Sequence, residues 1–234
     1  MKFNFRKDSL ILLGNTHLFS VTKHILTSNK SLEGLDVVFL GDGGEMGRDL
    51  TSFEVAFGSL NRELKARDIN LFYIRGNHSH PDIWKLDWSL SNIFFVQDYD
   101  EGEFPNGKTA LFIGGGISLD RSIRKKDWDY FEDEGSAQIP DNFNKRFNFV
   151  FAHDCPEEFN QPTSSLKRIW KKFVDKDSEL VKDCVAQRGI MSKVCKITKP
   201  EKWFSGHFHN NCRESKNGTI YRCVDINELL EIKA

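Results

Sequence analysis

Short runs of apolar residues recur along this chain, and most of them end in glycine, asparagine, histidine or aspartate. Continuous apolar runs of four or five residues are typical of strands that are buried on both faces. Between the first runs, apolar residues recur at helical spacing over residues 19–28 and 52–67. This alternation of strand and helix predicts an α/β fold with crossover connections. The strand-like runs with polar ends are residues 10–13, 36–40, 71–74, 147–151 and 203–205.

The second half of the chain continues this pattern less regularly. Residues 120–140 mix acidic and aromatic side chains without a clear period, which indicates a loop or lid over a site. Asn217 and Gly218 separate two strand-like runs, a sequence signal for a tight β-hairpin. Because no repeat, linker or low-complexity tract interrupts the chain, we interpret residues 1–234 as a single domain. Further strands are predicted at 93–97 and 109–113, and further helices at 164–172 and 178–187.

The charge and composition narrow the class of protein. The 33 Lys and Arg residues nearly balance the 34 Asp and Glu residues, which argues against a dedicated nucleic-acid-binding protein. No stretch approaches the roughly 18 apolar residues of a membrane span, and the run at 10–13 is too short for a secretory signal. We therefore expect a cytoplasmic protein without a membrane partner. The five cysteines form no CxxC pair, so reduced thiols are expected rather than a zinc ribbon.

Histidines are concentrated where the strands are predicted to end. A single loop histidine is most simply an exposed polar residue, but five of them together with Asp42 and Asn77 indicate a metal site. Imidazole with carboxylate and amide oxygen suits Mn, Fe, Co or Zn, whereas calcium would take oxygen ligands and structural zinc more often cysteine. A catalytic two-metal centre fits this ligand set best. The five histidines are His17, His78, His153, His207 and His209.

Taken in chain order, the five strand ends read GNTH, GDGGE, RGNH, HD and GHFH. This order resembles the calcineurin-like metallophosphoesterase superfamily, whose pattern is DxH, GDxxD, GNH, H and GHxH. The match runs from residue 14 to 209, and residues 114–121, followed by Trp128, resemble the smaller bacterial and phage-encoded members. The resemblance implies a metallophosphoesterase-type β-sandwich of two mixed sheets flanked by helices, with the site at the strand ends.

The resemblance also implies a role for each matched residue. Asp42 would bridge two divalent transition-metal ions, with Mn favoured over Fe, Zn, Co or Ni, and a hydroxide between the ions would attack phosphorus. His78 would stabilise the phosphoryl oxygens or protonate the leaving group. The other ligands would be Asn15, His17 and His209 for the first ion, and Asn77, His153 and His207 for the second.

Three further residues are candidates for the reaction. Glu45 stands where the family often has the aspartate that orients the histidine, and its carboxylate could accept the imidazole N–H of His78. Arg75 directly precedes the GNH motif, as in Ser/Thr-phosphatase-like members, where a guanidinium can bind phosphate oxygens through two hydrogen bonds. Arg121 is a second candidate for binding phosphate, and pairing with nearby acids is an equally strong interpretation of it.

Asn15 departs from the family pattern, which has aspartate at this position. An amide oxygen can bind a metal but carries no charge, so Asp42 alone would balance the positive charge of two ions. We therefore expect the first ion to bind more weakly than in a typical member.

The leading hypothesis is a dinuclear metal-dependent phosphoesterase that acts on a small-molecule or phosphoprotein ester, with phosphomonoesters favoured over diesters because of Arg75. One alternative is a binding or scaffold protein that keeps the fold but has a weakened metal site, for which Asn15 is the evidence. Another is a nuclease or nucleic-acid-binding member, since basic residues surround Trp170 within 167–172. The near-zero net charge favours a solvated helix face there instead.

Overall fold

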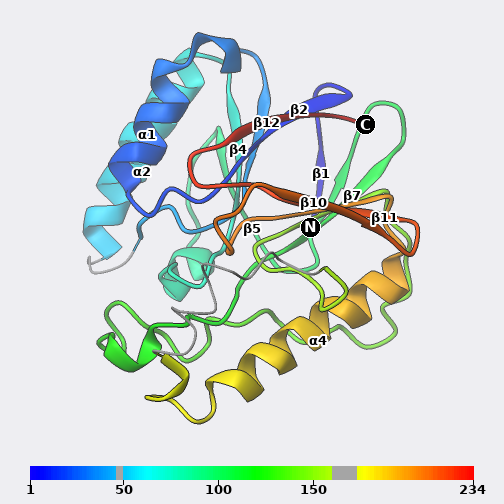
Figure 1. Cartoon of the computed structure of the whole chain (residues 1–234). Coiled ribbons are helices and arrows are strands. Elements are labelled where there is room, and N and C mark those ends of the chain that lie inside the picture. The colour runs from blue at the N-terminus through cyan, green and yellow to red at the C-terminus, as the bar shows by residue number, and fades with distance from the viewer. Residues whose placement is uncertain (46–49, 160–172) are drawn as a thin grey trace.

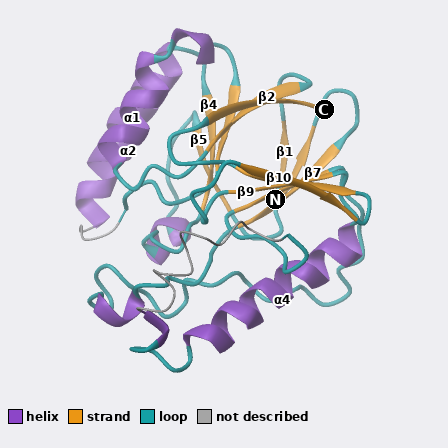
Figure 2. Ribbon diagram, viewed as in Figure 1, coloured by secondary structure: helices purple, strands orange, loops and turns teal. Residues whose placement is uncertain are grey.

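Two β-sheets pack face to face, and helices cover the outer face of each sheet (Figures 1 and 2). The computed structural model describes residues 1–45, 50–159 and 173–234. Each sheet contains both parallel and antiparallel neighbours, so both are mixed. This arrangement confirms the α/β sandwich that the sequence analysis expects. Within the described residues, no helix is both long and apolar enough to cross a membrane.

The five-stranded sheet follows the order β12 (Leu229–Lys233), β2 (Ser9–Leu13), β3 (Asp36–Phe39), β4 (Asn70–Ile74) and β5 (Ile93–Val96). Strands β2 to β5 run parallel, whereas β12 is antiparallel to β2. Helices α1 (Phe19–Ser28) and α2 (Leu50–Ala66) cover the outer face of this sheet, at the left of Figure 1. Helix α2 is held there by an apolar stripe along one face, because its buried side chains are Phe53, Phe57, Leu60 and Leu64.

The seven-stranded sheet follows the order β1 (Lys2–Asn4), β6 (Glu101–Glu103), β7 (Thr109–Ile113), β8 (Phe149–Ala152), β9 (Lys202–Ser205), β11 (Thr219–Cys223) and β10 (Cys212–Lys216). Its central strands β7, β8 and β9 run parallel. Helix α4 (Leu180–Thr198) covers the outer face of this sheet through Met191, Val194 and Cys195, at the bottom of Figure 1.

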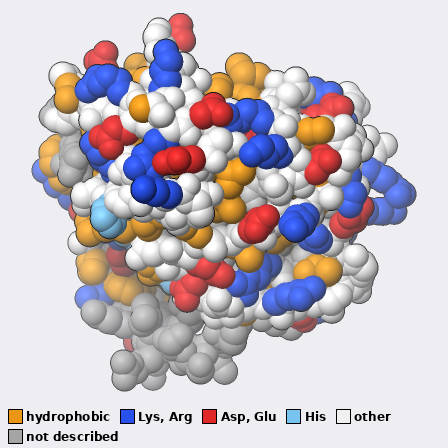
Figure 3. All heavy atoms as spheres, turned by 90° about the horizontal axis from the view of Figure 1, so that it is seen from above, with side chains coloured by type: hydrophobic (Ala, Val, Ile, Leu, Met, Phe, Trp, Pro, Cys, Tyr) orange, Lys and Arg blue, Asp and Glu red, His pale blue; other side chains and the backbone are white. Residues whose placement is uncertain are grey.

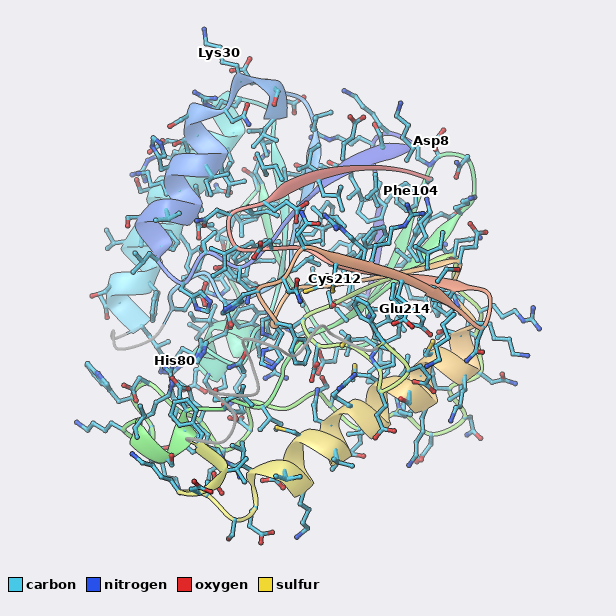
Figure 4. The ribbon with its side chains drawn as sticks, viewed as in Figure 1. Asp8, Lys30, His80, Phe104, Cys212 and Glu214 are labelled. Atoms are coloured by element: carbon cyan, nitrogen blue, oxygen red, sulfur yellow. The ribbon has the colours of Figure 1, made fainter. Side chains whose placement is uncertain are left out.

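Aromatic side chains fill the space between the two sheets. Phe72 from β4 stacks on Phe112 from β7 with ring centroids 6.3 Å apart, and Phe5 contacts both rings. Phe104, labelled in Figure 4, packs against Phe5 at 4.6 Å and is buried in the same layer. Burial on both faces explains why the central strands are continuous apolar runs rather than alternating ones.

Most of the predicted elements are confirmed within a residue or two of their ends, including the seven predicted strands and the helices at 19–28 and 52–67. The hairpin is confirmed as well, with Asn217 and Gly218 at φ values of 53° and 82°. The helix predicted at 178–187 is longer, because α4 continues to Thr198. Residues 120–140 form a loop with one short 3₁₀ turn at Arg121–Ile123. The helix predicted at 164–172 lies outside the described residues.

Candidate metal centre

The carboxyl ends of the central parallel strands from both sheets bring the predicted ligands to one place. Loops after β2, β3 and β4 supply one group of them, and loops after β8 and β9 supply the other. Carboxyl ends of parallel strands are the usual location of ligand sites in α/β sheets. The structure brings together Asn15, His17, Asp42, Asn77, His153, His207 and His209, and places His78 beside them.

Four of these residues have a left-handed backbone, which L-residues with a side chain adopt at a cost of about 1–2 kcal/mol each. The φ angle is 56° at His17, 59° at Asp42, and 48° at both His207 and His209. Such conformations let a chain that leaves a buried strand turn at once and direct its side chain back over the strand end. Backbone strain of this kind persists where the surrounding structure fixes it, most often at functional sites.

Acceptor atoms of three side chains converge around the second predicted ion position. His153 Nδ1 donates to the Leu40 carbonyl at 2.6 Å, which leaves Nε2 facing Asn77 Oδ1 at 2.8 Å and Asp42 Oδ2 at 3.4 Å. Asn77 Nδ2 donates to Ser118 Oγ, so its Oδ1 is the atom directed at His153. Burial opposes the charged imidazolium, but Asp42, the Leu40 carbonyl and Asp154 together outweigh burial and raise the pKa of His153. A divalent ion fits the position that this proton would otherwise take.

The first predicted ion position is lined by two imidazoles that point at each other. The Nε2 atoms of His17 and His209 lie 2.7 Å apart. Burial lowers the pKa of His17, and burial together with the nearby His17 lowers the pKa of His209 to about 4. Both rings are therefore neutral near pH 7 and can offer a lone pair to a metal. Burial also holds the pKa of His207 well below its usual range, so this ring of the second position is neutral as well.

Asp42 belongs to both positions. In each of two groups of side chains, the ligand atoms lie within 4.8 Å of one another. The first group is His17, Asp42 and His78, and the second is Asp42, His153 and His207. Asp42 Oδ1 accepts from the His78 backbone N–H at 2.9 Å. Burial opposes its charge, but His153, His78 and His17 outweigh burial and hold the pKa of Asp42 well below its usual range. A single ionised carboxylate thus lies between two sets of imidazoles, as a bridging ligand would.

Gly76, in the loop after β4, makes room for this carboxylate. A Cβ atom at residue 76 would lie 2.0 Å from Asp42 Oδ1 and 2.5 Å from the Asp42 backbone nitrogen. Real Cβ atoms do not approach other heavy atoms so closely, so this position accepts only glycine. The glycine of the RGNH sequence is therefore part of the site architecture.

Asn15 faces the centre with its amide nitrogen rather than its oxygen. Its Nδ2 lies 3.3 Å from Asp42 Oδ2 and 3.2 Å from His209 Nε2, whereas its Oδ1 accepts from the His207 backbone N–H at 3.3 Å. The side chain is buried, with 1% of its surface exposed. In this orientation, Asn15 donates hydrogen bonds to two of the predicted ligands, Asp42 and His209, and does not direct its oxygen at the centre as the sequence analysis expects.

The expected pair of Glu45 and His78 is not formed in the described structure, which corrects that prediction. Glu45 Oε1 accepts from the Tyr73 hydroxyl, and Oε2 accepts from Ser79 Oγ at 3.1 Å. Burial, with the charge of Asp42 nearby, raises the pKa of Glu45 to about 8, so its carboxyl group is largely neutral near pH 7. Glu45 is thus a buried support of the loop after β4, because both its oxygens are taken by hydroxyl groups.

Neither of the two predicted arginines contacts the candidate ligands through its hydrogen bonds in the described structure. Arg75 donates to the carbonyls of Glu134 and Gly135 at 3.0 and 2.7 Å, and it also pairs with Asp98. It therefore fastens the loop at 133–135 to the strand end, which corrects the role predicted for it. Arg121 follows the alternative interpretation, since it pairs with acids: its partners are Asp177 at 2.5 Å and Asp183 at 2.7 Å.

Arg124 is the residue that sequence analysis missed. Its Nη2 lies 3.4 Å from His78 Nε2, and Asp120 orients its guanidinium through contacts of 2.6 and 2.7 Å. It lies three residues after Arg121 in the same loop, just past the end of the short helix at Arg121–Ile123, where its backbone is extended. The signal in the sequence was the second arginine of DRSIR, but nothing local distinguishes the two.

The loop at 120–140 is held over this region by several contacts. His80, labelled in Figure 4, packs its ring against Phe131 at 4.8 Å and caps the turn at Pro81–Lys85 through a hydrogen bond from Asp82 N. Glu134 Oε1 accepts from Ser118 N at 2.7 Å, and burial raises the pKa of Glu134 to about 7. These contacts hold the loop in place, and the loop places Arg124 next to His78.

Neither a protein-family model nor a curated protein sequence matches this chain. One solved chain of similar size has 12% sequence identity over 97% of this chain and 98% of its own length, with a TM-score of 0.54. A cold-active protein tyrosine phosphatase of a psychrophilic Shewanella species has 13% identity over 99% of this chain and 77% of its own, with a TM-score of 0.40. A protein serine/threonine phosphatase from Saccharomyces cerevisiae, similar to human phosphatase PP5, has 15% identity over 96% and 70%, with a TM-score of 0.37. The first likeness supports the fold, and the TM-scores of the two phosphatases are too low to bear on activity.

Proposed function

We propose that this protein is a dinuclear metal-dependent phosphoesterase of the calcineurin-like metallophosphoesterase type, with Mn as its preferred ion. The observation that carries the proposal is Asp42, one ionised carboxylate shared by two sets of imidazoles. Two divalent ions bound there would activate a water molecule for attack on phosphorus and neutralise the charge of the phosphate. The sequence motifs at the five strand ends support the same conclusion independently of the geometry.

His78 is suited to contact the phosphoryl group directly. A guanidinium only donates hydrogen bonds, so the contact with Arg124 assigns the lone pair to His78 Nε2 and the proton to Nδ1. Nδ1 is buried and has no hydrogen-bond partner among the described residues. Burial also lowers the pKa of His78, which keeps the ring neutral near pH 7. A buried N–H group without an acceptor among the described residues, beside the predicted ions, can donate a hydrogen bond to a phosphoryl oxygen and so stabilise its developing charge.

Arg124 takes the role that the sequence analysis gave to Arg75. Its guanidinium is always charged and lies next to His78, so it can bind the non-bridging oxygens of a phosphate. The preference for phosphomonoesters now depends on Arg124, because a monoester has more charged oxygens than a diester for an arginine to bind.

The first test concerns the ions. We expect the protein, after loading with Mn and desalting, to carry up to two ions per chain by elemental analysis. Asp42→Asn should lose both ions, because it removes the one charge that the two positions share. Asp87→Asn serves as the control, since Asp87 is exposed and lies outside the centre. An ion content near zero under every loading condition would exclude the two-metal centre.

The second test concerns Arg124. We expect Arg124→Gln to lower kcat/KM for a phosphomonoester at least about tenfold, because hydrogen bonds to charged groups contribute roughly 1.5–3 kcal/mol. Arg121→Gln is the matched change three residues away, and it should act mainly on the melting temperature, since Arg121 pairs with Asp177 and Asp183. The assignment is wrong if the two variants have the same kcat/KM. The same substrate panel, with phosphopeptides, nucleotides, cyclic nucleotides and oligonucleotides, tests the ester preference.

The binding-protein alternative keeps one observation in its favour, the amide nitrogen that Asn15 directs at Asp42. Hydrolysis of a chromogenic phosphate ester with added Mn would exclude this alternative. The nucleic-acid alternative rests on basic residues within 167–172, which lie outside the described residues. On the face that Figure 3 shows, basic and acidic side chains are interspersed, so this face offers no uniform basic surface for a phosphate backbone.

A further inference from the structure

A cavity of about 280 Å³ lies next to the second ion position. His207, a predicted ligand of that ion, forms part of its wall. Ile117 and Leu119 line it on another side, and they flank Ser118, whose hydroxyl accepts from Asn77. The cavity therefore borders the predicted metal centre at His207 and beside the residue that binds Asn77.

The wall of this cavity is largely apolar and partly exposed. Phe208 contributes a half-buried ring, and Val185 on α4 has 57% of its surface exposed. Val181, one helical turn earlier on the same face of α4, is 40% exposed. Exposed valines beside an opening leave apolar surface in water, which a ligand could cover at a gain of roughly 25 cal/mol per Å².

The charged residues of the wall disfavour an anionic occupant. Arg188 directs its guanidinium to the backbone, where it donates to the carbonyls of Pro156 and Phe159 at 2.7 and 2.8 Å. The Cζ atom of the Arg188 guanidinium lies 5.7 Å from the centre of the Phe208 ring. Asp154 and Glu157 add carboxyl groups to the same wall. Among the described residues, the cavity wall thus consists mainly of aromatic and aliphatic side chains and two acids. Its one arginine is bound to backbone carbonyls.

We propose that this cavity binds the organic group of the substrate, and that this group is apolar, aryl or branched alkyl, rather than anionic. The inference rests on the proposed function, because the metal centre must hold the phosphoryl group for the substituent to enter the cavity. A volume near 300 Å³ is at the lower end for ligand pockets and suits one ring or a branched chain. The substrate is therefore a phosphate ester of an apolar alcohol or a phenol.

Two phosphonates that cannot be hydrolysed test this inference by binding alone. Calorimetric titration of the Mn-loaded protein should show phenylphosphonate binding at least about tenfold more tightly than methylphosphonate, because only the phenyl group reaches the apolar wall. Val185→Glu should reduce this preference about threefold or more, and Leu119→Ser is a second variant with the same expected direction. Val55→Glu is the matched control, since Val55 is 71% exposed on α2, across the molecule from α4 in Figure 1.

The outcomes separate this inference from the proposed function. Equal dissociation constants for the two phosphonates would overturn the apolar cavity and leave the phosphoesterase proposal standing. The Val185→Glu and Leu119→Ser variants could also prefer phenylphosphonate as strongly as the Val55→Glu control does. That result would place the phenyl group elsewhere and overturn the cavity assignment. Failure of the Mn-loaded protein to bind either phosphonate would overturn both proposals together.

Discussion

His78→Asn is expected to lower kcat about 10²–10³-fold while the protein keeps its metal ions, since removing one hydrogen-bond donor to the charge that develops in the transition state costs a factor of this size. The reason lies in the two ring nitrogens. Nε2 faces Arg124, and Nδ1 is a buried N–H group without a partner among the described residues. Asparagine preserves a polar side chain and the backbone N–H that binds Asp42, but it removes the imidazole from the substrate. The test measures kcat and, by elemental analysis, the metal content of the same preparation.

A second substitution provides the contrast. His207→Asn removes a predicted ligand of the second ion, so activity and metal content should fall together. His78 also lies within ligand distance of His17 and Asp42, which makes this comparison decisive. Parallel loss of metal and activity in His78→Asn would show that His78 is a metal ligand instead of a catalytic residue.

The central strands could be predicted because their signal is local. Residues 37–40 are all apolar, and the structure buries β3 on both faces between the helices and the other sheet. Strands β1, β6 and β12, of which β1 and β12 lie at sheet edges, were not predicted. Strand β1 has three residues and exists because Lys2–Asn4 pairs with Glu101–Glu103, about a hundred positions away. Sequence patterns do not contain such a pairing, so these three strands had to come from the structure.

That the candidate ligands lie together could be predicted for a related reason, since each motif follows directly on a strand whose carboxyl end faces the same region. The arginines and Glu45 could not, because their partners come from distant segments. Arg75 is held by carbonyls about 60 positions later, and Glu45 by Tyr73 and Ser79, 28 and 34 positions away. Arg121 and Arg124 lie in the same loop, whose sequence has no clear hydrophobic period. Only the folded conformation of this loop shows that Arg124, and not Arg121, lies next to His78.

The orientation of Asn15 leads to the last expected result. Asn15→Asp exchanges an N–H donor for a carboxylate oxygen at the position 3.3 Å from Asp42 Oδ2. Two buried carboxylates at this separation repel each other unless a cation lies between them. The variant should therefore be less stable than the native protein when a chelator is present. It should bind the first ion more tightly, by about 10–100-fold, the range over which ligands and their close supports affect metal affinity.

Thermal melting in chelator and in Mn, together with a competitive metal titration, measures both effects on one preparation. Asn217→Asp is the matched control, because it makes the same change in an exposed turn that accepts aspartate equally well. If Asn15→Asp melts like the control in chelator and binds Mn no more tightly, Asn15 does not face Asp42. A gain in metal affinity without hydrolysis of any ester would instead support the binding-protein alternative, because the centre would then be complete in charge and still inactive.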